Sequence, residues 1–176
     1  MKKKINILLL LIAIGLTNMA FNVITNWKVK GEDYSVKISG TKIKGGFTGL
    51  KATLIFDPSH LETGNLTATI DAGSLSTGNF LKTRHALSEE ALDAEKYPTI
   101  SFQSDLIIKK GTSYEASGKL TLKGVTKNIV IPFIFIGNNA EGSFKGSFKI
   151  NPHDYNLTRH GVPEEILITL DIPVTH

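Results

Sequence analysis

Apolar and polar residues alternate along most of this chain. In one such stretch, Leu66, Ala68 and Ile70 fall on one side of an extended segment, while Thr67 and Thr69 fall on the other. Comparable apolar or alternating runs occupy residues 27–29, 34–39, 47–56, 66–71, 99–108, 113–123, 128–137, 144–150 and 166–172. A two-residue period with one apolar side is typical of antiparallel sheets, so the pattern predicts a mainly β protein of about eight or nine strands.

Short turn motifs separate these runs. They are Gly45-Gly46, Asp57-Pro58, Lys110-Gly111 and Asn138-Asn139. Such short links predict meander connections between strands that lie next to each other. Because closure removes the unpaired edges of a sheet, we expect a closed antiparallel β-barrel of about eight strands, with an interior that is packed or holds one small ligand.

Residues 74–97 interrupt the alternation with apolar positions at helix-like spacing. Ser88 is followed by Glu89 and Glu90, which predicts a helix start there, because a hydroxyl can cap free N–H groups and acidic side chains favour the first turn. The excursion is expected to end at Pro98. It is long enough to lie across one mouth of the barrel.

The N-terminus has the composition of a signal peptide. Three lysines follow Met1, and residues 5–16 are almost entirely apolar. This run of about a dozen residues is too short for a membrane-spanning helix, which needs about 20. We therefore expect residues 1–20 to be cleaved near Ala20 and residues 21–176 to form one β-barrel domain, periplasmic or secreted and without a stable membrane span.

Charge and chemical motifs narrow the function. The chain has 20 Lys and Arg against 16 Asp and Glu, but three of the lysines lie in the leader, so no clustered basic surface for nucleic acid is expected. It has no cysteine for disulfides or thiolate metal sites. Its five histidines are scattered, and the motifs of hydrolases and nucleotide-binding loops do not occur. These features predict a protein without metal, cofactor or catalytic residues.

Two features favour a hollow interior over a filled one. The inward-facing set is rich in Phe, and residues 129–136 are apolar on both sides apart from Pro132. A stripe of Phe residues is equally typical of a packed core, so the pattern alone leaves both alternatives open.

Two ordered motifs carry a family resemblance. Residues 97–104, with the sequence YPTISFQS, and residues 116–127, with the sequence ASGKLTLKGVTK, resemble the signature of the YceI-like family of periplasmic polyisoprenoid-binding proteins. Further similarity lies in residues 46–57, 76–79, 84–98 and 148–155. The resemblance implies a lipocalin-like barrel that encloses the tail of a long isoprenoid lipid, such as a polyprenyl compound or an isoprenoid quinone.

Two positions depart from the family pattern. Ala91-Leu92-Asp93 stands where relatives usually have Phe-Phe-Asp, which would widen the mouth. The loop at residues 156–165 carries Arg159 and His160 instead of glycine-rich, acidic sequence, so headgroup contacts of relatives do not transfer to it.

Combined with the two-residue period, the resemblance predicts ligand contacts. The expected apolar contacts of the interior are Phe47, Leu66, Ile70, Ile100, Phe102, Leu120, Leu122, Phe133, Phe144, Phe148 and Ile168. Arg84, His85 and Tyr155 are the expected headgroup contacts, through their hydrogen-bond donors. The alternative interpretation is a solvated helix surface for Arg84 and His85, and a structural corner for Tyr155.

Three hypotheses follow. The first is a binding protein that carries or stores an isoprenoid lipid and is not an enzyme. The second is a structural or interaction protein whose barrel is filled, and the third is an enzyme that uses the region of Arg84 and His85. The sequence is compatible with a monomer or a dimer.

Overall fold

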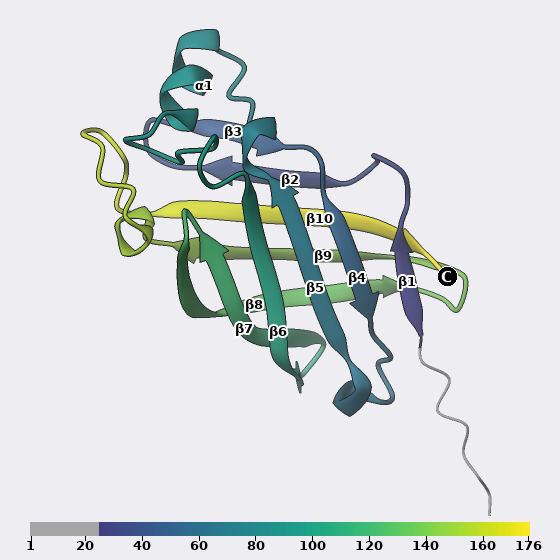
Figure 1. Ribbon diagram of the computed structural model, residues 1–176. Helices are drawn as coiled ribbons and strands as arrows, with labels where there is room; N and C mark the ends of the chain where they lie inside the picture. Colours follow the sequence, from purple (N-terminus) through teal and green to yellow (C-terminus); the bar gives the residue numbers. More distant parts are fainter. Residues whose placement is uncertain (1–24) are drawn as a thin grey trace, which may run out of the picture.

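The computed structural model describes residues 25–176, so the predicted signal peptide lies outside the described residues. Ten strands form one antiparallel sheet (Figure 1). The strands are β1 (Asn26–Val29), β2 (Ser35–Ser39), β3 (Lys44–Phe47), β4 (Lys51–Ile55), β5 (Asn65–Asp71), β6 (Thr99–Lys110), β7 (Ser113–Leu122), β8 (Val125–Gly137), β9 (Glu141–Ile150) and β10 (Ile166–Thr175). Because β1 pairs with both β4 and β10, the sheet closes as β1-β4-β5-β6-β7-β8-β9-β10, and the predicted closed barrel is confirmed.

Two strands share the free edge of β10. The C-terminal end of β10 pairs with β1, with Thr175 opposite Lys28. Its N-terminal half pairs with β2, with Leu167 opposite Ser39, and β2 then pairs with β3. The wall therefore has one end built with β1 and β4, called here the closed end, and another built with β2 and β3, called here the mouth.

The predicted turn at Gly45-Gly46 is wrong, because both residues lie inside β3. Gly46 and Ser76 exchange two backbone hydrogen bonds of 2.9 Å, which join β3 to the segment that follows β5. A Cβ at Gly45 would lie 2.6 Å from the Ser76 carbonyl oxygen, so the close approach of the two backbones requires glycine. The expected single strand 47–56 is accordingly two strands, with a break at residues 48–50.

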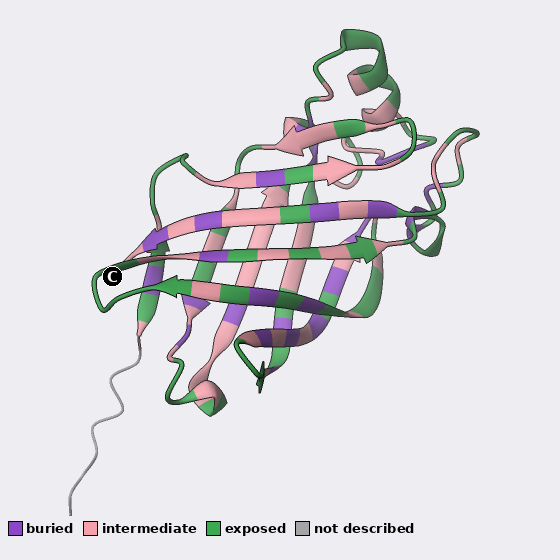
Figure 2. Ribbon diagram, turned by 180° about the vertical axis from the view of Figure 1, so that it is seen from behind, coloured by how far each residue is buried: buried purple, intermediate pink, exposed green. Residues whose placement is uncertain are grey.

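Inward side chains fill the closed end. Phe56, just after β4, is 0% exposed, and its ring centroid lies 5.0 Å from that of Tyr114 and 5.4 Å from those of Phe135 and Phe144. Aromatic pairs at such distances add stabilisation beyond the burial of their area. The alternation of burial along the strands is visible in Figure 2.

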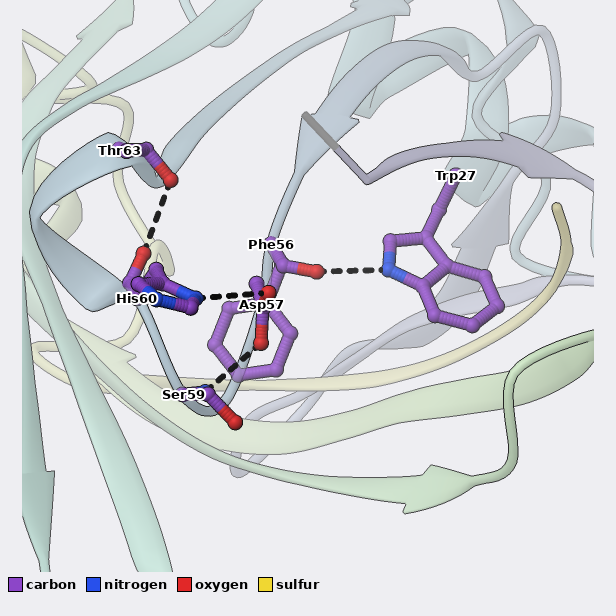
Figure 3. A network of polar contacts seen from close by, with 6 residues as sticks. All are labelled: Trp27, Phe56, Asp57, Ser59, His60 and Thr63. Carbon is purple, nitrogen blue, oxygen red and sulfur yellow. Dashed lines mark hydrogen bonds and ion pairs between the residues drawn. The ribbon is translucent and has the colours of Figure 1, made fainter. Parts of the chain in front are cut away.

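Polar contacts fix the chain beside this aromatic cluster (Figure 3). The Trp27 indole N–H donates to the Phe56 carbonyl oxygen at 2.9 Å. Next to it, the Asp57 carboxylate accepts from the Ser59 backbone N–H at 2.7 Å and lies 3.1 Å from His60 Nδ1. The Ser59 hydrogen bond and the His60 contact lower the pKa of Asp57. The turn predicted at Asp57-Pro58 is thereby held in a defined conformation.

A bulge in β6 changes which residues face inward. The pairing of β6 with β7 shifts register between Ser104 and Leu106, so Leu106 points outward and Ile107 inward. Gly118 lies opposite the bulge, where a Cβ would clash with the Gln103 carbonyl oxygen. The inward Ser104 hydroxyl accepts from the Leu66 backbone N–H at 2.8 Å, which satisfies a buried polar group.

The helical excursion differs from its prediction. The α-helix α1 (Phe80–Leu87) begins after Asn79, whose side chain accepts from the Lys82 backbone N–H. The predicted helix start at Ser88 is wrong: Ser88 ends the helix, and its hydroxyl donates to the His85 carbonyl oxygen at 2.9 Å. A serine followed by acidic residues is typical of the N-terminus of a helix. Here the serine hydroxyl donates instead to a carbonyl oxygen three residues earlier in the chain. Within residues 25–176, no helix has the length and apolar character needed to cross a bilayer.

We expect Phe56→Ala to lower the free energy of unfolding by about 3–5 kcal/mol, because it leaves a cavity in the aromatic cluster. Urea denaturation measures this change. Phe80→Ala is the matched control, since Phe80 is 77% exposed, and should change the value by less than about 0.5 kcal/mol. Equal losses in both variants would contradict the assignment of the cluster as the core of the closed end.

The loss of stability on acidification should depend in part on Asp171. Its carboxylate accepts from Lys145 Nζ at 2.8 Å and from the Ser143 hydroxyl at 2.7 Å, and these bonds lower its pKa in the folded state. The lowered pKa stabilises the fold above the ordinary Asp value of about 4, and this stabilisation is lost as the pH falls through the folded pKa.

Asp171→Asn should therefore reduce stability at neutral pH by less than about 1 kcal/mol, because both partners are nearly half exposed, and the difference should vanish in acid. Thermal melts from pH 7 down to about pH 3 measure this. Asp105→Asn, which breaks a longer ion pair of 3.7 Å with Lys119, is the control and should have a smaller effect.

Candidate functional site

The mouth half of the barrel contains a cavity of about 420 Å³, within the range of ligand pockets. Inward side chains such as Ile70, Ile100 and Phe102 are only half-buried, because they face open space instead of other side chains. Inward residues of the closed end, such as Phe133, are buried. The interior is thus filled at one end and hollow at the other.

Most of the expected apolar contacts line this cavity. They are Phe47, Ile70, Ile100, Phe102, Leu120, Leu122, Phe148 and Ile168. Leu66, Phe133 and Phe144 lie instead in the aromatic cluster of the closed end, outside the cavity lining. The two-residue period identifies the inward side of a strand but not the depth of a residue along the barrel, which is why these three were included.

Several aliphatic residues of the cavity wall lie outside the set predicted from the sequence. They are Val36, Ile38, Leu50, Ile131, Ile150, Leu157, Val162, Ile166, Leu170 and Ile172. Several continue the alternation of predicted contacts: Ile150 follows Phe148, and Leu170 and Ile172 follow Ile168. Aliphatic side chains form most of the hollow end, which also contains three of the five predicted Phe residues, Phe47, Phe102 and Phe148.

The titratable residues of the cavity lining are all basic. They are Lys42, Lys82, His85, Arg159 and His160, from the β2–β3 turn, α1 and the loop before β10. All except Arg159 are exposed, so the cavity reaches solvent at this rim. His85 is the one predicted headgroup contact among them.

Arg84 and Tyr155 do not line the cavity. The Arg84 guanidinium lies over the Phe80 ring, 5.7 Å from its centroid, on the exposed side of α1. Tyr155 is buried at the end of the 3-10 helix η3 (Pro152–Tyr155), just before the loop that leads to β10. Its burial, and to a smaller extent the negative charge of Asp154, raise the pKa of its hydroxyl. Its neutral hydroxyl fits the structural corner that was the alternative interpretation. The enzyme hypothesis requires Arg84 and His85 to face the same cavity. Only His85 lines it.

Residues 85–94 form a lid over part of the cavity. Ala91 and Leu92 of the lid are buried and line the cavity, at the position where the sequence departs from the family pattern. Arg159 Nη1 donates to the His85 carbonyl oxygen at 3.1 Å. Its Nε lies 3.6 Å from the Glu90 carboxylate.

A second cation ties the lid to the same loop. Lys123, in the β7–β8 turn, donates from Nζ to the Glu89 carbonyl oxygen at 2.8 Å and to the Asn156 carbonyl oxygen at 3.2 Å. The lid is therefore held by side chains from two other segments. Among the described residues, no group of three or more His, Asp or Glu side chains could hold a metal ion.

A family comparison identifies this fold. The model of the YceI-like domain matches residues 27–174. The chain belongs to the YceI-like family. A UPF0312 protein of Vibrio cholerae serotype O1 is 29% identical over 154 residues, which cover 84% of this chain and 78% of that protein.

Solved structures share the YceI-like barrel. BcnA of Burkholderia cenocepacia superposes with a TM-score of 0.79 at 24% identity, covering 84% of this chain and 100% of its own. A polyisoprenoid binding domain from Saccharophagus degradans, implicated in plant cell wall breakdown, superposes with a TM-score of 0.62 at 12% identity, covering 85% of this chain and 97% of its own. At these identities the likeness shows a common fold.

Arg159→Gln should loosen the lid, because it removes the bond to the His85 carbonyl and the Glu90 ion pair. Loss of about 1 kcal/mol of local stability would speed exchange of the hydrogen-bonded Leu92 and Ala94 amides about fivefold. Hydrogen–deuterium exchange measures this. Lys149→Gln breaks a 2.8 Å ion pair with Glu165 and serves as control; equal acceleration by both variants would argue against a latch at Arg159.

Proposed function

We propose that this protein binds a long isoprenoid lipid, such as a polyprenyl compound or an isoprenoid quinone, with its apolar tail inside the barrel. The mature protein acts in the periplasm or outside the cell, where it carries or stores the lipid and catalyses no reaction. The supporting observation is the hollow, aliphatic end of a barrel whose other end is filled.

The energetics favour this ligand class. Burying one CH₂ group contributes about 0.8 kcal/mol, so one five-carbon isoprene unit contributes up to about 4 kcal/mol. Three or four buried units contribute up to about 12–16 kcal/mol, which leaves the roughly 8 kcal/mol of micromolar affinity after ordering losses of about 4–8 kcal/mol, without any strong polar contact. A cavity with mostly apolar walls, whose charged and titratable side chains lie at the rim, suits such a ligand.

The family supports the same proposal. The domain from Saccharophagus degradans is described as polyisoprenoid-binding and shares the fold of this chain. The filled-barrel hypothesis applies only to the closed end, where the aromatic cluster occupies the interior.

Ala68 offers a direct test, because it lines the cavity between Ala52 of β4 and Phe102 of β6. We expect Ala68→Trp to weaken binding of geranylgeraniol by at least about tenfold, since the indole takes the space of part of the tail. Titration calorimetry on delipidated protein measures this, and mass spectrometry of an organic extract identifies any lipid that copurifies.

Ala140→Trp is the matched control. Ala140 is exposed in the β8–β9 turn, so the same added side chain should leave binding unchanged. A wild-type protein that yields no prenyl compound on extraction and does not bind geranylgeraniol would overturn the proposal. Equal affinities of the Ala68→Trp variant and the wild type would show that the tail does not occupy this cavity.

A further inference from the structure

Two large apolar side chains are exposed at the start of α1. Phe80 is 77% exposed and Leu81 is 54% exposed. The other exposed large apolar residues of the described chain lie on the strands β6 and β8. Phe80 and Leu81 lie on the helix α1, which Figure 1 shows projecting from the end of the barrel.

The helix presents different residues to the cavity and to the outside. Lys82, His85 and Ala86 line the cavity. At about 100° per residue, Phe80 lies on the opposite side of the helix from these residues, and Leu81 lies to one side of them. The exposed pair is therefore on the outer surface of the mouth and does not contribute to the cavity wall.

Basic side chains lie on the same helix as the exposed pair and on the rim beside it. The helix carries Lys82, Arg84 and His85 and has no acidic residue. Arg84 lies over the Phe80 ring, and Lys42 of the β2–β3 turn is exposed at the same mouth. The first acidic residues, Glu89 and Glu90, come after the end of the helix, and Glu90 is paired with Arg159. Exposed apolar residues beside basic ones are typical of surfaces that bind anionic bilayers.

We propose that the mouth docks on a lipid bilayer that contains anionic lipids. Phe80 and Leu81 enter the boundary between headgroups and acyl chains, and Arg84 beside them and Lys42 on the rim contact lipid phosphates. The purpose of this docking rests on the proposed function. Because the cavity opens beside the docking surface, an isoprenoid passes between the bilayer and the barrel without exposing its tail to water. Exposure would cost about 0.8 kcal/mol for each CH₂ group.

Flotation with two kinds of vesicle tests the docking. Delipidated protein should float with vesicles of phosphatidylcholine and phosphatidylglycerol, and more weakly with phosphatidylcholine alone. The double variant Phe80→Ser and Leu81→Ser should bind the anionic vesicles about tenfold more weakly than the wild type does. Arg84→Gln should weaken binding to the anionic vesicles about fivefold and leave binding to neutral vesicles unchanged.

Leu106→Ser is the matched control, because Leu106 is 55% exposed but lies on β6, away from α1. It should float like the wild type. Docking is overturned if the wild-type protein stays unbound with both kinds of vesicle, if the double variant floats equally well, or if α1 binds another protein instead of lipid.

Geranylgeraniol binding in solution separates this inference from the proposed function. Phe80 and Leu81 do not line the cavity, so their double variant should bind geranylgeraniol as tightly as the wild type does. Intact binding without flotation would overturn docking alone. Flotation without geranylgeraniol binding would overturn the proposed function and leave the docking surface supported.

Discussion

Closure of the sheet depends on how the second edge of β10 is paired. No single strand of the described chain runs along the whole of this edge. The short strands β1 and β2 divide that edge between them, and β4 and β3 continue the wall beyond each. At the mouth, the wall closes through the two bonds between Gly46 and Ser76. These bonds pair part of the outer edge of β3, which would otherwise leave the same backbone groups unpaired.

The division of the wall coincides with a division of the interior. Around Phe56, aromatic side chains pack into a solid cluster, and the Trp27 indole bonds to the chain beside it. Toward the mouth, shorter aliphatic side chains leave a cavity of about 420 Å³. A rigid, filled end can keep the hollow end open without a ligand, because the stability lost to an unfilled cavity is offset by packing elsewhere.

The segments that interrupt the barrel carry the features on which both proposals rest. The lid at residues 85–94 and the loop before β10 meet above the cavity, tied by Arg159 and Lys123. On the outside, α1 exposes Phe80 and Leu81. An apolar interior, a tied lid and a helix that exposes two apolar side chains beside basic ones suit a protein that holds a lipid tail within reach of a bilayer.

Alternation along the strands was enough to predict the β class, the closed barrel and the inward side of most strands, because side-chain direction follows backbone geometry alone. Depth within the barrel was not predictable: Leu66, Phe133 and Phe144 alternate like Ile70 and Phe148, yet they fill the closed end. The Gly45-Gly46 pair resembled a turn. Glycine is required there by the close approach of Ser76, which is distant in the sequence. Local pattern thus determined orientation, whereas the long-range pairing of strands decided which inward side chains meet one another and which face empty space.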